Sequence, residues 1–93
     1  MSTRCVWKFE IELLPFTLSM PLGAEIVAVQ SQHGEPHLLA IVDPSENRVV
    51  LRMFAVIGTG HAFPSDYAYV ATWQEPPFVW HLFERLATPE KTT

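Results

Sequence analysis

Cysteine is almost absent from the sequence, because Cys5 is the single cysteine among 93 residues. A lone cysteine excludes an intrachain disulfide, and chains without disulfides are typical of reducing compartments. A long apolar run is also missing: no stretch approaches the ~20 residues that a membrane-spanning helix needs, and the first residues show no signal-peptide pattern. We therefore expect a cytoplasmic protein that makes no contact with a membrane.

Positive charge is scarce and scattered. Six lysines and arginines stand against ten acidic residues, for a formal net charge of −4, and no two basic residues lie within three positions of each other. Sequence-independent binding of nucleic acid needs clustered cations. The pattern therefore argues against DNA or RNA as a direct partner. The acidic residues are spread evenly as well, so they do not form a row that imitates phosphates.

Apolar residues, by contrast, are abundant. They make up 48% of the chain, whereas charged residues make up 17%, against about 25% in a typical soluble domain. A chain of this length buries only about two-thirds of the surface that its unfolded form exposes. We therefore predict one β-rich domain over residues 1–86, a polar tail over residues 87–93, and association with another protein or with a second copy.

Apolar and polar residues alternate with a period of two in several segments, which is the pattern of half-buried β-strands. In residues 7–13 the alternation places four side chains on one face: Trp7, Phe9, Ile11 and Leu13. In residues 67–74 it places four more on one face: Tyr67, Tyr69, Ala71 and Trp73. Residues 38–42 are apolar without alternation, which predicts a central strand covered on both faces.

Turn residues divide the rest of the sequence into further short strands. Gly34 predicts a hairpin, and residues 48–57 form the longest strand candidate. The last apolar segment, 78–86, fits either a short amphipathic helix or a strand, and its aromatic and β-branched residues favour the strand. The whole pattern predicts an all-β fold, either a small antiparallel barrel or a two-layer sandwich of six to seven strands.

A candidate ligand loop follows the longest predicted strand, and its four residues are Gly58, Thr59, Gly60 and His61. Glycine loops bind phosphates through backbone N–H groups, but the established patterns need a third glycine or a lysine, and a following helix, which this segment does not have. The segment therefore fits a turn in which Gly58 and Gly60 adopt positive φ. A small ligand or nucleotide bound at this loop is the alternative, with His61 as a ligand or general base.

No catalytic or metal site is predicted. Ser65 and Asp66 lie near His61 in the sequence, but a serine–aspartate pair after a proline is ordinary turn composition, so we do not predict a catalytic triad. A zinc site normally takes three or four ligands, whereas the predicted hairpin brings together only two of the four histidines, His33 and His37. We therefore expect neither enzymatic activity nor a cofactor nor a metal.

Five aromatic residues lie in three different predicted strands: Trp7, Trp73, Phe78, Trp80 and Phe83. Two interpretations stay open for them. Their rings can build one core, or some of them can form a protein-binding face made by the first and last strands, since tryptophan and tyrosine are enriched at interface hot spots.

Three segments carry a resemblance to known sequences: "EIVAVQSQHGEPHLLAIVDP", "FAVIGTGHAFP" and "FVWHLFE". With them, the chain resembles a group of short uncharacterised proteins encoded by bacteriophages and prophages, over most of its length from Trp7 to Glu84. The resemblance implies an accessory factor, and some such factors inhibit host immunity by binding a host protein stoichiometrically. It implies no residue roles.

These observations support three hypotheses. The first is a non-enzymatic phage-type accessory protein that binds a host protein, inhibits an anti-phage defence system and forms a homodimer. The second is a small-ligand or nucleotide-binding domain that uses the loop from Gly58 to His61. The third is a virion or assembly component.

Overall fold

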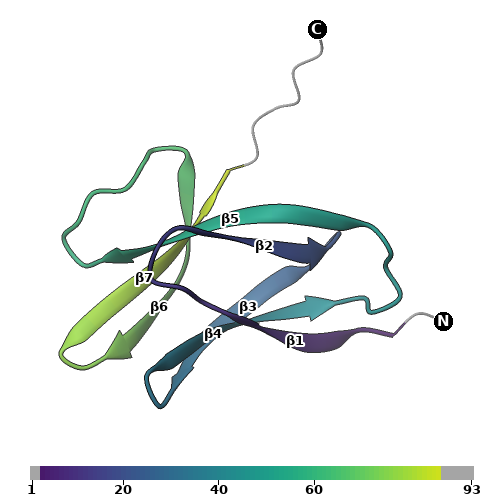
Figure 1. The fold of residues 1–93 in the computed structure, drawn as a ribbon, viewed down its shortest axis with the longest axis horizontal. Coiled ribbons are helices and arrows are strands. Elements are labelled where there is room, and N and C mark those ends of the chain that lie inside the picture. Colours follow the sequence, from purple (N-terminus) through teal and green to yellow (C-terminus); the bar gives the residue numbers. More distant parts are fainter. Residues whose placement is uncertain (1–2, 87–93) are drawn as a thin grey trace, which may run out of the picture.

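The alternating segments form β-strands, and turns separate them. The computed structural model describes residues 3–86, so the tail predicted over residues 87–93 lies outside the described residues. These form seven antiparallel strands in two sheets (Figure 1): β1 (Cys5–Glu10), β2 (Phe16–Pro21), β3 (Glu25–Gln32), β4 (Glu35–Val42), β5 (Val49–Gly58), β6 (Tyr67–Glu75) and β7 (Phe78–Arg85). This described part of the chain contains no helix, and hence none that is long and apolar enough to cross a membrane.

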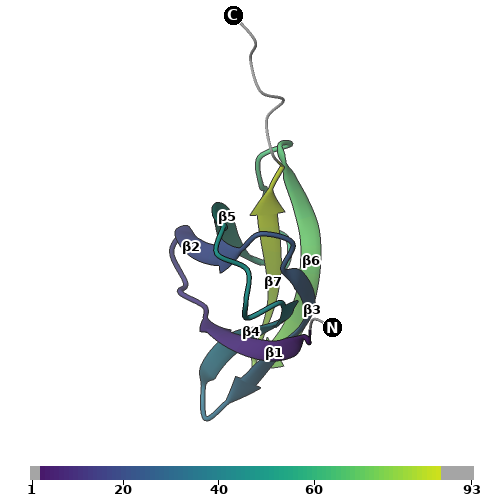
Figure 2. The same ribbon diagram turned by 90° about the vertical axis from the view of Figure 1, so that its right-hand side faces the viewer.

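The two sheets pack as an open sandwich. One sheet has three strands in the order β1-β4-β3, and the other has four in the order β2-β5-β7-β6. On one side of the sandwich β3 lies beside β6 (Figure 2), where the Ser31 hydroxyl donates a hydrogen bond to the Glu75 carboxylate. The predicted all-β class is confirmed, with the sandwich rather than the closed barrel. The segment that allowed a helix or a strand is strand β7.

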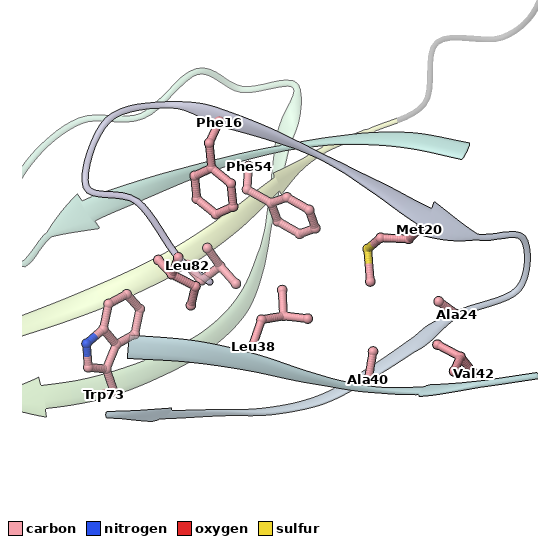
Figure 3. Packing of buried hydrophobic residues seen from close by; sticks show 10 residues of the cluster. Phe16, Met20, Ala24, Leu38, Ala40, Val42, Phe54, Trp73 and Leu82 are labelled. Atoms are coloured by element: carbon pink, nitrogen blue, oxygen red, sulfur yellow. The ribbon is translucent and has the colours of Figure 1, made fainter. Parts of the chain in front are cut away.

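The core lies between the sheets and draws on both (Figure 3). Its largest fully buried side chains are Met20 and Phe54 with Leu82 from the four-stranded sheet, and Leu38 and Val42 from the three-stranded sheet. Phe16 stacks on Phe54 with ring centroids 5.4 Å apart. Burial of one such side chain stabilises the fold by about 1.5–3 kcal/mol. These contacts therefore hold β2 and β5 onto the opposite sheet.

β4 lies at the centre of its sheet, between β1 and β3, as its apolar run predicts. Only one of its faces is fully covered, however. Leu38, Ala40 and Val42 point into the core and are buried, whereas Leu39 and Ile41 on the other face are half-buried. The predicted coverage on both faces is wrong, because no layer packs on the outer side of this sheet among residues 3–86.

The prediction that Tyr69 and Trp73 share one face of β6 is wrong. Tyr69 pairs with Phe83, but Ala71 pairs with Leu82, so an extra residue lies between them as a β-bulge. A bulge of one residue moves every following side chain to the other face. As a result Trp73 is buried in the core, whereas Tyr69 is exposed on the outer face.

The alternation predicted through residue 13 stops earlier. β1 ends at Glu10, and Leu13 lies in the connection to β2, where its side chain is exposed. Ile11 remains buried and its backbone N–H donates to the carbonyl of Pro36. The chain leaves the three-stranded sheet here, because β2 belongs to the other sheet.

Two polar turns set the strand ends. His33 and Gly34 both have positive φ, 54° and 77°, which is the geometry of the two-residue turns that favour tight hairpins. Between β4 and β5, the guanidinium of Arg48 donates two hydrogen bonds to the carboxylate of Glu46 and holds the pKa of Glu46 at about 2. This pairing orders the chain directly before β5 begins at Val49.

We expect Phe54→Ala to lower the free energy of unfolding by about 3–5 kcal/mol, because it leaves a cavity between the sheets. The matched control is Met53→Ala, one residue earlier on β5, where the side chain is 41% exposed; we expect a loss of about 0.5 kcal/mol or less there. Urea denaturation measures both. Equal losses for the two variants would contradict the assigned core.

Candidate functional site

The loop after β5 is a turn, as predicted, but its two glycines serve different purposes. Gly60 has a φ of 89°, and the N–H of His61 donates to the carbonyl of Gly58 at 3.1 Å. Gly58 does not have positive φ, so that part of the prediction is wrong. A Cβ on Gly58 would instead lie 3.4 Å from the ring of Trp80 on the neighbouring strand. Gly58 therefore allows a close approach rather than a turn.

This packing creates a cleft at the beginning of β7. Phe78 and Trp80 stack with ring centroids 5.5 Å apart. Together with the loop residues Gly58, Thr59 and His61 they line an open cleft of about 380 Å³. The structure thus brings the predicted ligand loop and two of the five singled-out aromatic residues to one place.

His81 lies on the outer face beside this loop, held by two hydroxyls. Its Nε2 is 2.8 Å from Oγ1 of Thr59, and its Nδ1 is 2.8 Å from Oγ1 of Thr72. The Tyr69 hydroxyl is in turn 2.8 Å from Oγ1 of Thr72. Hydroxyls orient the imidazole but do not supply the carboxylate that activates a catalytic histidine. Among the described residues no three histidine, cysteine or acidic side chains are grouped to hold a metal ion.

The other singled-out aromatic residues do not gather on one exposed face. Trp73 is buried in the core. Phe83 is buried on the outer face, because the ring of Phe63 covers it at a centroid distance of 4.0 Å. Trp7 lies on β1 in the other sheet, 40% exposed, and Phe78 is 57% exposed. Of these five residues, only Trp7 and Phe78 are therefore classed as exposed, and they lie in different sheets.

Of the strands, β5 has the most exposed large apolar residues, four in all, and they lie in its first half, residues 49–53, which we call the β5 arm. Because Phe54 points into the core, alternation directs Val49, Leu51 and Met53 outward. Their side chains are 64%, 72% and 41% exposed. The sequence did not predict this surface, because a valine-rich segment is typical of a buried strand. We call these three residues the outward stripe.

The β5 arm is exposed because β5 is longer than either of its neighbours. β2 pairs with residues 49–54 of β5, whereas β7 pairs only with residues 54–58. Among residues 3–86, therefore, no strand pairs with the β5 arm on the β7 side. Figure 1 shows this half of β5 running with β2 away from β7. The sequence feature that indicated this exposure was the length of the segment, since β5 corresponds to the longest strand candidate.

A groove of about 580 Å³ follows this unpaired edge. It is lined by Gly23 and Ala24, by residues 50–53 of the β5 arm, and by residues 84–86 at the end of β7. The groove therefore lies where a strand continuing the line of β7 would run.

The charges in the groove are already paired. The Arg52 guanidinium donates two hydrogen bonds to the Glu84 carboxylate, at 2.5 and 2.7 Å, and a third to the carbonyl of Ala24 at 2.7 Å. Arg85 pairs with Asp66 at 3.1 Å. A bidentate pair of this kind has little left to offer a charged ligand. The groove consequently favours an apolar occupant over an ionic one.

A family model described as a domain of unknown function (DUF7352) matches residues 2–93. No curated protein and no solved structure matches the chain. The match spans nearly the whole chain, so the sandwich, the cleft and the β5 arm all lie within the family's domain. It brings no activity with it.

We expect Arg52→Ala to lower the free energy of unfolding by about 1–3 kcal/mol, because it leaves the half-buried Glu84 carboxylate without its donors. Adding Glu84→Ala should restore part of that loss, so the double variant loses less than the sum of the single variants. Arg85→Ala is the control, since its pair is about half exposed and contributes ~0–1 kcal/mol. Strict additivity in urea denaturation would contradict the coupling.

Proposed function

We propose that this chain, which belongs to the DUF7352 family, is a non-enzymatic binding protein that acts by occupying the surface of another protein. One observation carries the proposal: the outward stripe exposes Val49, Leu51 and Met53 side by side on one sheet face. Apolar surface gathered in this way on a small domain is typical of an interaction site. Removal of this apolar surface from water on binding contributes about 25 cal/mol of binding free energy per Å² of apolar area buried.

The charge distribution supports a particular kind of partner. The outward stripe carries no charge, and the chain as a whole has a net charge of −4. A partner surface with an apolar centre and a basic rim complements both properties, since complementary charge speeds association and the apolar centre supplies affinity. The resemblance to phage-encoded accessory factors makes a bacterial host protein of the defence machinery the first partner to test, in the host cytoplasm.

The arrangement also supports binding over catalysis. Both ring nitrogens of His81 contact threonine hydroxyls, and the acidic residue that lines the groove, Glu84, is paired with Arg52. Neither cluster combines a nucleophile with an activated base, which covalent catalysis needs. Stoichiometric occupation of a partner needs only the exposed surface.

We expect the immobilised chain to retain a host protein in near-equal amount from a bacterial lysate, and Leu51→Lys to abolish that retention, because a charge would be desolvated at the centre of the contact. Leu14→Lys is the matched control: Leu14 is 77% exposed, outside the β5 arm, and should retain the partner fully. Quantified band ratios measure the result. Equal retention by the Leu51 and Leu14 variants, or no specific retention from several hosts, would refute the proposal.

A second candidate function is small-ligand binding in the cleft beside Gly58. The cleft volume of about 380 Å³ falls within the ~300–1,000 Å³ usual for ligand sites, and the stacked Phe78 and Trp80 offer a flat apolar wall. The side chain of His61 lies beside this wall and supplies a polar group. A planar ligand such as a nucleobase suits these features.

For this candidate we expect a nucleotide in a thermal-shift screen to raise the melting temperature through mass action, and both His61→Ala and Phe78→Ala to remove the shift. His37→Ala, a histidine on the other sheet, should leave the shift unchanged. Absence of any shift, or a shift that survives the His61 and Phe78 changes, would eliminate the cleft as a ligand site.

A further inference from the structure

We propose that a second copy of the chain adds its own β5 arm, antiparallel, along the unpaired edge of the first. The two four-stranded sheets would then join into one continuous sheet across a two-fold axis. This goes beyond the proposed function, because it uses the edge of the β5 arm, whereas the partner protein would cover the outward stripe.

The edge has the form that strand addition needs. Residues 49–53 pair on one side only, with β2, and an edge strand with an open row of backbone groups is a template for another strand. The groove along it, about 580 Å³, lies in the line of β7 and gives the added strand room. Its ionic groups are satisfied within the chain by the pair of Arg52 with Glu84. A mostly apolar strand is therefore the occupant that fits.

The β5 arm of a second copy meets that description, and it is a strand whose conformation is already set. Four of its five residues are apolar: Val49, Val50, Leu51 and Met53. The contact is isologous, so each copy supplies both the groove and the strand that fills it, and two-fold symmetry closes the assembly as a dimer. Leu86, exposed at the end of the groove, adds apolar surface for the incoming strand.

Charge selects the register. A two-fold axis perpendicular to the sheet keeps outward side chains outward in both copies. The axis passes at one residue position of the β5 arm, and that residue lies opposite its own copy. Every other residue of the arm then lies opposite a residue on the same face. An axis at Arg52 would place two Arg52 side chains opposite each other, and an axis at Val50 would place Arg52 opposite Arg48. Like charges directly opposite are destabilising. An axis at Leu51 places Arg52 opposite Val50, with no charge opposed, and pairs the five residues of the β5 arm entirely with one another. An axis at Met53 would need Phe54, which already pairs with Glu84 on that side, so Leu51 lies at the axis.

In this register the two outward stripes merge. Leu51 faces its own copy, and Val49 of each chain faces Met53 of the other. The apolar face offered to a partner protein therefore doubles and becomes continuous across the axis. Dimer formation in this way would create a larger binding face. The backbones of the two β5 arms pair with each other, and the side chains of the outward stripes stay available to the partner protein.

A pair of charge variants at Val50 tests the edge and the register together. Val50 points inward, away from the outward stripe, and is 36% exposed. Val50→Lys would set a lysine opposite Arg52 twice per dimer, and we expect dimer affinity to fall about tenfold. Val50→Glu would oppose Arg52 with a carboxylate and should leave the affinity equal or higher. Sedimentation equilibrium over a concentration series measures both, with Leu14→Lys as the control that dimerises like the unmodified chain.

Cysteine cross-linking supplies a second readout. With Cys5→Ser to remove the native thiol, Leu51→Cys should form an intermolecular disulfide under copper-phenanthroline oxidation. Residues directly opposite in an antiparallel pair have Cα atoms ~4.5–5.5 Å apart, within the ~4.4–6.8 Å that a disulfide spans. Val49→Cys, on the same face, would lie about 13 Å from its own copy, at ~3.3 Å per residue, and should not cross-link.

Three results would overturn the inference. They are a monomer at every concentration, equal dimer affinities for the lysine and glutamate variants, and cross-linking of Val49→Cys as fast as Leu51→Cys. Leu51→Lys changes the outward stripe and would also set two lysines opposite each other at the axis, whereas Val50→Lys leaves the outward stripe intact, so retention of the host protein by Val50→Lys reports on the partner proposal alone. Failure of the dimer and failure of the partner proposal are therefore distinguishable.

Discussion

Phe54 is the residue on which the four-stranded sheet depends. It is the one position of β5 that pairs with both neighbours, Phe16 on β2 and Glu84 on β7. Its fully buried ring stacks on Phe16 and closes the space between the sheets. From this point β5 extends in two directions, each with a single partner strand. The core anchors the middle of β5, and the sheet is staggered around that anchor.

The stagger connects the fold with the candidate function. Because β7 ends near Phe54, the first half of β5 keeps only β2 as a neighbour, and its side chains face water on the outer side. The ion pair of Arg52 with Glu84 links this half to the end of β7, and each side chain neutralises the charge of the other within the groove. What remains is an apolar face and an unpaired edge on one short strand segment, each open to a different kind of protein contact.

The sequence predicted those features that local patterns determine. Alternation, turn residues and composition indicated the all-β class, the hairpin at Gly34 and the strand at residues 78–86. It could not predict features set by pairing between distant segments. The bulge after Tyr69 places Trp73 in the core, and Phe63 covers Phe83, yet neither event leaves a local signal. The β5 arm was missed for the same reason: whether Leu51 is buried depends on where β7 ends, not on the residues around it.

Amide hydrogen exchange along β5, measured by NMR at a low and a high protein concentration, tests whether the β5 arm has an unpaired edge, because it reports which backbone groups are paired. In dilute protein we predict that between Val49 and Met53 only the amides bonded to β2 are protected, so fast and slow exchange alternate. At high concentration the fast amides should gain protection. Uniform protection of all five amides in dilute protein would contradict the claim, because the edge would then already be covered within a single chain.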